Sequence, residues 1–232
     1  MLFSRKDVAS FIDQYFEPVW QSVRPVPLVR IDFGNQNVVM RTLHGNIATY
    51  ALTTNGEVLD IVAGIYTPDV YLGRLNQLRL LAAYVAQAPE AGRLERLAQY
   101  HQSQLDALAK NQPRPRLIDT AGLAKGRIEG SMRIVLASGQ PPEHQRPTPV
   151  PQGNALERTD LWKLLIEDTR QNENDRSRLI HKMLASAGRV HPEQIVARLY
   201  KEVLHTDLAD PHLGLDEVLM AHYPFAAEDR GH

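Results

Sequence analysis

Cysteine is absent from this chain of 232 residues. The absence excludes disulfides, thiolate nucleophiles, dithiol redox cycling and thiolate metal sites. An excess of charge of either sign is also missing, because 26 Lys and Arg oppose 27 Asp and Glu, and the net charge is −1. We therefore expect no long-range attraction to nucleic acid or to an anionic membrane.

Long apolar runs are missing as well. No stretch approaches the roughly 20 apolar residues that cross a bilayer, and no apolar core of signal-peptide length follows Met1. The sequence also lacks the glycine-rich phosphate loop, the dinucleotide fingerprint and the Gly-x-Ser-x-Gly nucleophile motif. These absences predict a cytoplasmic chain with no membrane and no nucleic-acid partner.

The first part of the chain has patterns of one helix and four strands. Ser4 to Asp7 reads as a capping box, and helical spacing of apolar residues predicts a helix over residues 5–16. Alternating patterns then predict strands at 28–33, 38–43, 47–54 and 58–62. Asn55-Gly56 between the last two predicts a type I′ hairpin turn.

The rest of the chain is predicted to be mainly helical. Thr67 with Pro68 predicts a helix start, and helix continues to Lys110 with a break at Ala88-Pro89. Clustered prolines predict a linker over residues 112–152, although 127–136 has the pattern of either a strand or a short helix. Three further helices are expected, beginning near Thr159 or Asp160, near Val190-His191-Pro192 and at Asp210-Pro211.

Several motifs in this order resemble the thioredoxin fold entered partway through. Phe16-Glu17-Pro18-Val19, after a short helix, is similar to the family's segment leading into a strand. The run from Ala48 to Val58 resembles its strand-turn-strand, and Gly64 to Pro68 resembles the start of its last helix. The whole chain is similar to a group of uncharacterised bacterial thioredoxin-like proteins.

This resemblance implies an α+β fold class. We expect a partial thioredoxin-like β-sheet with flanking helices, followed by a proline-rich linker and a small all-α C-terminal domain. The expected divisions are a truncated thioredoxin-like domain at 1–82, connecting helices at 83–111, the linker at 112–152 and the helical domain at 153–228.

Redox chemistry should be missing from such a protein. The family's Cys-x-x-Cys would fall before Met1, and its cis-proline falls on Ala48, where a cis bond costs roughly 2.5–4 kcal/mol. We therefore expect a trans Ile47–Ala48 bond and no oxidoreductase activity. The former active-site face offers candidate binding residues, namely His44, Asn46, Ala48 and Thr49.

The start of the chain carries a further expectation. Met1 falls where the family's active-site helix would end, so the first strand and helix of the fold are expected to be missing. Either the chain is a fragment, or another part or another chain completes the sheet. An uncovered sheet edge favours pairing with a partner, so a protein partner or self-association is expected.

A cluster near the C-terminus offers a second kind of chemistry. Imidazole and carboxylate side chains suit zinc, iron or manganese, and four of them occur within eight positions: His205, Asp207, Asp210 and His212. Glu202 and His205 form one Glu-x-x-His pair without a second copy, and Glu217 and His222 stand near enough to join. The competing interpretation is ordinary polar residues around a helix start at Asp210.

Three functional hypotheses follow from these patterns. The first is a catalytically inactive thioredoxin-like protein, without a cofactor, that acts through protein contacts or as a scaffold. The second is a metal-binding protein or metal-dependent enzyme that holds a divalent ion with its C-terminal His and Asp residues. The third is a fragment of a longer thiol-disulfide oxidoreductase.

Overall fold

The structure is a computed structural model that describes residues 2–24, 28–32, 38–42, 47–120, 134–137, 155–211 and 213–214. It mixes helices with short antiparallel strands, so the α+β class is confirmed. The chain divides into two compact units. The first unit comprises Met1–Val19 and Ile47–Pro192, and the second comprises Trp20–Asn46 and Glu193–His232.

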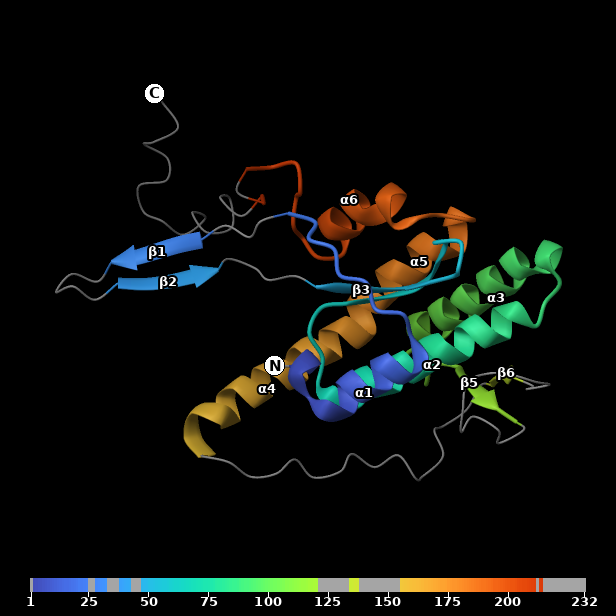
Figure 1. The fold of residues 1–232 in the computed structure, drawn as a ribbon, viewed down its shortest axis with the longest axis horizontal. Helices are drawn as coiled ribbons and strands as arrows, with labels where there is room; N and C mark the ends of the chain where they lie inside the picture. Colours follow the sequence, from blue (N-terminus) through green and yellow to red (C-terminus); the bar gives the residue numbers. More distant parts are fainter. Residues whose placement is uncertain are drawn as a thin grey trace. The chain divides into compact units, whose positions relative to one another are not determined.

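The elements follow one another along the chain as Figure 1 labels them. A short 3-10 helix, η1, spans Leu2–Ser4, and a π-helical segment, η2, spans Asn172–Arg176. The α-helices are α1 (Lys6–Tyr15), α2 (Pro68–Ala86), α3 (Glu90–Ala109), α4 (Ala155–Gln171), α5 (Ser177–Ala187) and α6 (Pro192–Glu202). The strands are β1 (Leu28–Asp32), β2 (Val38–Thr42), β3 (Ala48–Leu52), β4 (Val58–Ala63), β5 (Arg116–Asp119) and β6 (Ile134–Ala137).

The β3–β4 hairpin closes through a different turn from the one its sequence predicts. Gly56 has a φ of 81°, whereas Asn55 is not among the residues with positive φ. The Gly56 N–H donates to the Thr53 carbonyl at 2.9 Å, and the Thr53 N–H donates to the Glu57 carbonyl at 2.8 Å. This is a three-residue loop whose single left-handed position is a glycine, so the reversal was predicted correctly and the type I′ geometry was wrong.

Strand β4 carries a β-bulge that matters for the site. Ala51 pairs with Asp60 while Leu52 pairs with Val58, so Leu59 is an extra residue in the β4 strand. All six residues of β4 are buried. A strand buried on both faces needs cover from other elements, and α2 and α5 both pack against β4.

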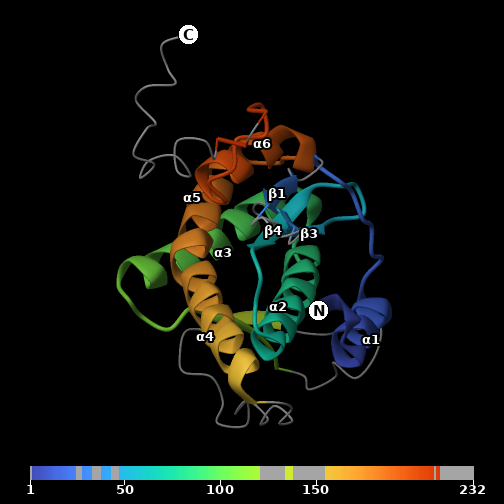
Figure 2. The same cartoon turned by 90° about the vertical axis from the view of Figure 1, so that its left-hand side faces the viewer.

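The core of the first unit lies among β4, α2 and α3. Its largest fully buried side chains include Tyr71, Leu81 and Tyr100, which come from α2 and α3. Helix α5 packs against α3, and Figure 2 shows these helices around the β3–β4 hairpin. The spacing of apolar residues predicted helices at α2 and α3. The buried faces of these two helices form part of this core.

Helices α4 and α5 continue one another through η2. The helix begins at Ala155, earlier than the Thr159 or Asp160 predicted, and it ends at Ala187, just before Gly188, as expected. In η2, the Asn172 side-chain amide donates to the Ile65 carbonyl at 2.6 Å. Because α5 packs on α3 and β4 within the first unit, a separate C-terminal helical domain is not confirmed.

Part of the predicted linker is a hairpin. β5 and β6 pair as antiparallel strands, with Leu117 opposite Leu136. The Gln77 side chain bonds the Leu117 backbone twice, accepting from its N–H at 2.8 Å and donating to its carbonyl at 3.1 Å. The predicted linker thus contains a strand at 116–119 that was not expected, and within 127–136 the strand alternative holds for residues 134–136.

The second unit has its own hairpin and helix. β1 pairs with β2 as an antiparallel strand, with Arg30 opposite Met40. Near α6, the Arg24 guanidinium donates to three backbone carbonyls, those of Leu208, Asp210 and Pro211. The predicted helix beyond Asp210 lies mostly outside the described residues.

The strands form three separate two-stranded sheets among the described residues. The thioredoxin-like fold, which needs one sheet spanning residues 28–62, is therefore not confirmed. The predicted helix caps also differ, because the N-cap before α1 is Arg5 rather than Ser4, and neither Arg5 nor Thr67 makes a side-chain cap bond. No helix in the described ranges has the length and apolar character needed to cross a bilayer.

Two glycines test this account of the first unit. Gly64 has a φ of 96°, and a Cβ there would lie 2.6 Å from side-chain atoms of Asn172 and Arg176. Gly73 lies in α2, where an added Cβ would meet no other atom within 4 Å. We predict that Gly64→Ala lowers the free energy of unfolding by about 1–3 kcal/mol, whereas Gly73→Ala raises it by about 0.5–1 kcal/mol.

Urea unfolding of the two variants and the parent protein measures both changes. Equal effects of the two substitutions would contradict the close packing of η2 against the turn after β4.

Candidate metal centre

A buried carboxylate is the first component of the site. Asp60 lies in the middle of β4 and is 5% exposed. Its Oδ1 accepts the Ile61 N–H at 2.8 Å, and its Oδ2 accepts the Tyr100 hydroxyl at 3.3 Å. These two donors fix the orientation of the carboxylate, because each oxygen has its own partner.

Two histidines from different helices face this carboxylate. His101 comes from α3 and His181 from α5, and both are almost fully buried. Their Nδ1 atoms lie 2.9 Å apart, and His181 Nδ1 lies 3.9 Å from Asp60 Oδ1. We call Asp60, His101 and His181 the His2Asp centre.

The hydrogen bonds assign the tautomers of both imidazoles. His101 Nε2 lies 3.0 Å from the Leu59 carbonyl, and a carbonyl can only accept, so Nε2 carries the proton. His101 Nδ1 is then the acceptor in neutral imidazole, and His181 Nδ1 is the donor. The β4 bulge contributes directly, because Leu59 is its extra residue.

Burial keeps the centre near electrical neutrality. It raises the pKa of Asp60, although His101, the Ile61 N–H and Arg74 oppose that rise. It lowers the pKa of His101, against the attraction of Asp60. It also lowers the pKa of His181 well below the usual value, and the neighbouring His101 and Arg74 lower that pKa further. The His181–Asp60 approach is therefore a contact of a neutral imidazole rather than an ion pair.

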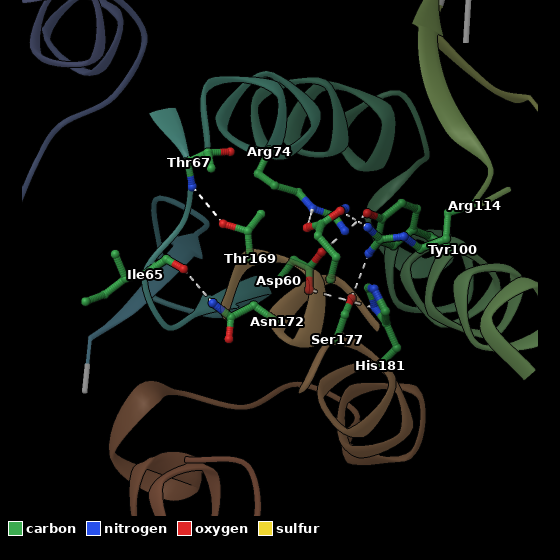
Figure 3. Close-up of polar contacts among 11 residues, drawn as sticks. Asp60, Ile65, Thr67, Arg74, Tyr100, Arg114, Thr169, Asn172, Ser177 and His181 are labelled. Atoms are coloured by element: carbon green, nitrogen blue, oxygen red, sulfur yellow. Dashed lines mark hydrogen bonds and ion pairs between the residues drawn. The ribbon is translucent and has the colours of Figure 1, made fainter. Parts of the chain in front are cut away.

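An ion-paired cluster lies beside the centre. Glu173 of η2 bonds Arg74 Nε of α2 at 2.5 Å and also pairs with Arg114. The Arg114 guanidinium donates to the Ser177 hydroxyl at 2.8 Å. Figure 3 shows Arg74, Arg114 and Ser177 close to Asp60, Tyr100 and His181, between the strand and the helices. The π-helical segment thus brings Glu173 to the two arginines.

The geometry of the His2Asp centre suits a metal ion. One ligand atom from each residue lies within 4.8 Å of the others, and all three residues are buried. Zinc–ligand bonds of about 2.0–2.1 Å in a tetrahedral site place ligand atoms roughly 3.3 Å apart, and two of the three atom pairs here, at 2.9 and 3.9 Å, bracket that value. His101 also donates its other ring N–H to a backbone carbonyl, which is the usual outer contact of a metal-bound histidine.

The site residues expected from the sequence lie elsewhere or outside the described residues. Ala48 and Thr49 lie in β3, half-buried, and the Thr49 hydroxyl bonds the Tyr71 hydroxyl at 2.9 Å. His44 and Asn46 are outside the described ranges. No cis peptide bond occurs among the described residues, in agreement with a trans Ile47–Ala48 bond.

The C-terminal candidates do not gather around a common point among the described residues. His205 is exposed, with a φ of 53°. Asp207 accepts from the Lys201 ammonium at 2.7 Å and from the Ala209 N–H. Asp210 is half-buried, while His212, Glu217 and His222 lie outside the described residues. A C-terminal metal site therefore stays a prediction.

Sequence reasoning missed the His2Asp centre, although each of its members leaves a signal. Asp60 interrupts the apolar strand Val58–Ala63, and a charged residue is rarely buried without a partner. His101 shares the buried face of α3 with Gln104 and Ala107, and His181 follows Ile180 on the buried face of α5. Titratable residues at core positions were the available clue.

Comparison of the chain with protein-family models, with curated proteins and with solved structures finds no match.

The lowered histidine pKa values predict acid sensitivity of the metal-free protein. The unfolded chain takes up protons as the pH falls through about 6.5, while folded His101 and His181 stay neutral. Their contribution to stability is therefore complete above pH 6.5 and is lost as the pH falls toward the lower folded pKa values. Each imidazole contributes a slope of up to about 1.4 kcal/mol per pH unit.

Urea unfolding in the presence of chelator, from pH 7.5 to 5.5, measures this slope. We expect His181→Asn to reduce it, while His205→Asn, at an exposed position with positive φ, leaves it unchanged. Equal slopes in the parent protein and His181→Asn would show that burial does not keep His181 neutral.

Proposed function

We propose that this protein binds a divalent transition-metal ion at the His2Asp centre, with zinc as the ion that its ligands suit. The observation that carries the proposal is the convergence of two imidazole nitrogens and one carboxylate from β4, α3 and α5 inside the core. Two nitrogen donors and one oxygen donor match zinc and also iron(II) or manganese. The sequence analysis offered a metal-binding protein as one hypothesis, and this proposal keeps that function but assigns it to different ligands.

The residues around Asp60 support the binding of a metal ion by its carboxylate. Asp60 must ionise to bind a cation, and a divalent charge beside it reverses the effect of burial on its ionisation. His181 must present Nδ1 without its proton, so the proton moves to Nε2 when the ion enters. Tyr100 and the Leu59 carbonyl then act as outer contacts that orient Asp60 and His101.

Three protein ligands leave one tetrahedral position open. Structural zinc sites usually have four protein ligands, whereas catalytic sites have three and keep a position for water or substrate. A small cavity of about 10 Å³ adjoins the centre, and Asp60, His181, Arg74, Tyr66 and Tyr100 are among the residues that line it. This arrangement favours a metal that binds a further ligand over a purely structural one.

Calorimetric titration of the chelator-treated protein with zinc tests the proposal. We expect one ion per chain. Loss of an outer contact costs about 10–100-fold in metal affinity, so Tyr100→Phe should weaken binding by about 10-fold. Asp60→Asn and His181→Asn remove ligands and should weaken it by more than about 100-fold.

The matched control is His205→Asn, which alters the exposed C-terminal histidine and should leave zinc affinity unchanged. Circular dichroism establishes that each variant is folded. A protein that binds no zinc, or whose binding is lost in His205→Asn and kept in His181→Asn, would contradict the proposal.

We also propose, as a second candidate, that the chain is a cysteine-free thioredoxin-like protein acting through contacts with a protein partner or with itself. The specific support is the order of the β3–β4 hairpin, Gly64 with positive φ and the helix start at Pro68, which agrees with the resemblance. The hypothesis that the chain is a fragment of a longer thiol-disulfide oxidoreductase stays a prediction.

An insulin-reduction assay with dithiothreitol as the electron source tests this second candidate. We expect no acceleration over dithiothreitol alone, because no thiol is present to relay electrons. Thiol-disulfide turnover by the purified chain would contradict it.

A further inference from the structure

The loop of the β3–β4 hairpin holds a chemically reactive pair, Asn55-Gly56. It is the only Asn-Gly pair in the sequence. Asparagine is a thermolabile residue, because the backbone nitrogen of the next residue can attack its side-chain amide. Glycine hinders that nitrogen least, since it has no Cβ. Asn55 is exposed, and its side chain makes no hydrogen bond within the described part of the chain.

We propose that Asn55 is a site of spontaneous covalent modification, by deamidation to aspartate and isoaspartate. The Gly56 nitrogen forms a bond to Asn55 Cγ, and the bond from Cγ to the side-chain nitrogen breaks. The proton of the Gly56 N–H leaves with that side-chain nitrogen as ammonia. Water then opens the cyclic imide at either of its carbonyl carbons. Opening at one carbon gives aspartate, and opening at the other gives isoaspartate, in which the main chain runs through Cβ and Cγ.

The folded loop restrains the first step. The imide ring joins the Gly56 nitrogen to Asn55 Cγ, so ring closure needs that nitrogen and Asn55 Cβ on the same side of the Cα–C bond. In a type I turn followed by a left-handed glycine, the residue before the glycine has a ψ of about 0°, which turns the nitrogen away from Cβ. The same nitrogen donates its N–H to the Thr53 carbonyl at 2.9 Å. The attack therefore requires the loop to open.

Further hydrogen bonds keep the loop closed. The Thr53 N–H donates to the Glu57 carbonyl at 2.8 Å, and the Glu57 N–H donates to Thr53 Oγ1 at 3.1 Å. Only the second of these depends on a side chain, so a substitution can remove it and leave the backbone bonds in place. Local opening of an exposed loop costs less than global unfolding. The modification therefore proceeds in the folded protein, at a rate that the stability of the closed loop sets.

Incubation of the full-length protein at mildly alkaline pH, followed by peptide mapping with mass spectrometry, measures the modification. We expect aspartate and isoaspartate to accumulate at Asn55. Asn111 should stay unmodified, because it is also exposed but precedes Gln112 rather than a glycine. The chain unfolded in guanidinium chloride should be modified at Asn55 faster than the folded protein by about 10-fold or more, because its loop is always open.

A pair of matched variants tests the restraint by the loop. Thr53→Val removes the side-chain hydrogen bond and should raise the rate in the folded protein by about 5-fold, the factor expected for the loss of one hydrogen bond. Thr54→Val makes the same change at the next residue, which is exposed and has no side-chain hydrogen bond within the described part of the chain. Its rate should equal that of the parent. Circular dichroism establishes that both variants are folded.

The outcomes separate the site from its restraint, and none of them depends on the metal centre. Absence of product at Asn55 in both the folded and the unfolded chain, or equal accumulation at Asn55 and Asn111, overturns the modification site. Equal rates at Asn55 in the folded and unfolded parent protein overturn the restraint by the loop, and this comparison needs no variant. Equal rates in folded Thr53→Val and Thr54→Val also overturn the restraint.

Discussion

The burial of Asp60 is the constraint on which the rest of the first unit depends. A carboxylate in the core needs donors or a cation, because an isolated buried charge is too costly to keep. Here the donors are the Ile61 N–H and the Tyr100 hydroxyl. Two imidazoles also face Asp60, and they belong to His101 of α3 and His181 of α5, eighty residues apart in the chain. Strand β4 and helices α3 and α5 are thus held to one another through a polar contact inside an apolar core.

Two local irregularities of the backbone position the residues that surround Asp60. The bulge at Leu59 gives β4 an extra residue, and the carbonyl of that residue fixes the tautomer of His101. The π-helical segment η2 places Glu173 against Arg74 and Asn172 against the Ile65 carbonyl. Both bulges and π-helical turns are common beside functional sites. The small cavity is lined by Asp60, the residue after the bulge, and by Ser177, the residue after η2.

Much of the secondary structure could be predicted from the sequence, whereas the site could not. Helix α1, the four N-terminal strands and the stop at Gly188 follow from local patterns of apolar residues, proline and glycine. The turn at Gly56 was misassigned because Asn-Gly fits both a type I′ turn and a type I turn followed by a glycine bulge. The β5–β6 hairpin was missed because prolines flank it, before β5 at 113 and 115 and after β6 at 141 and 142, and these prolines favoured a linker over paired strands.

The site itself depends on contacts that no local pattern contains. His101 and His181 meet only because α5 packs on α3, and that packing is set by apolar faces that many other pairings would satisfy equally. The residues around His205 were predicted as the metal site instead. Four metal-capable residues that are close in sequence are easier to recognise than three that meet only in the folded chain. A buried Asp in an apolar strand and a His on a buried helix face are the signals that narrow such a search.

The most direct test of the central claim is anomalous X-ray diffraction at the zinc edge from crystals of the zinc-treated protein. The account predicts one anomalous peak inside the first unit, about 2.0–2.2 Å from Nδ1 of His101, Nδ1 of His181 and an oxygen of Asp60. Absence of that peak, with the two Nδ1 atoms still sharing a hydrogen bond, would show that the three residues form a metal-free polar core.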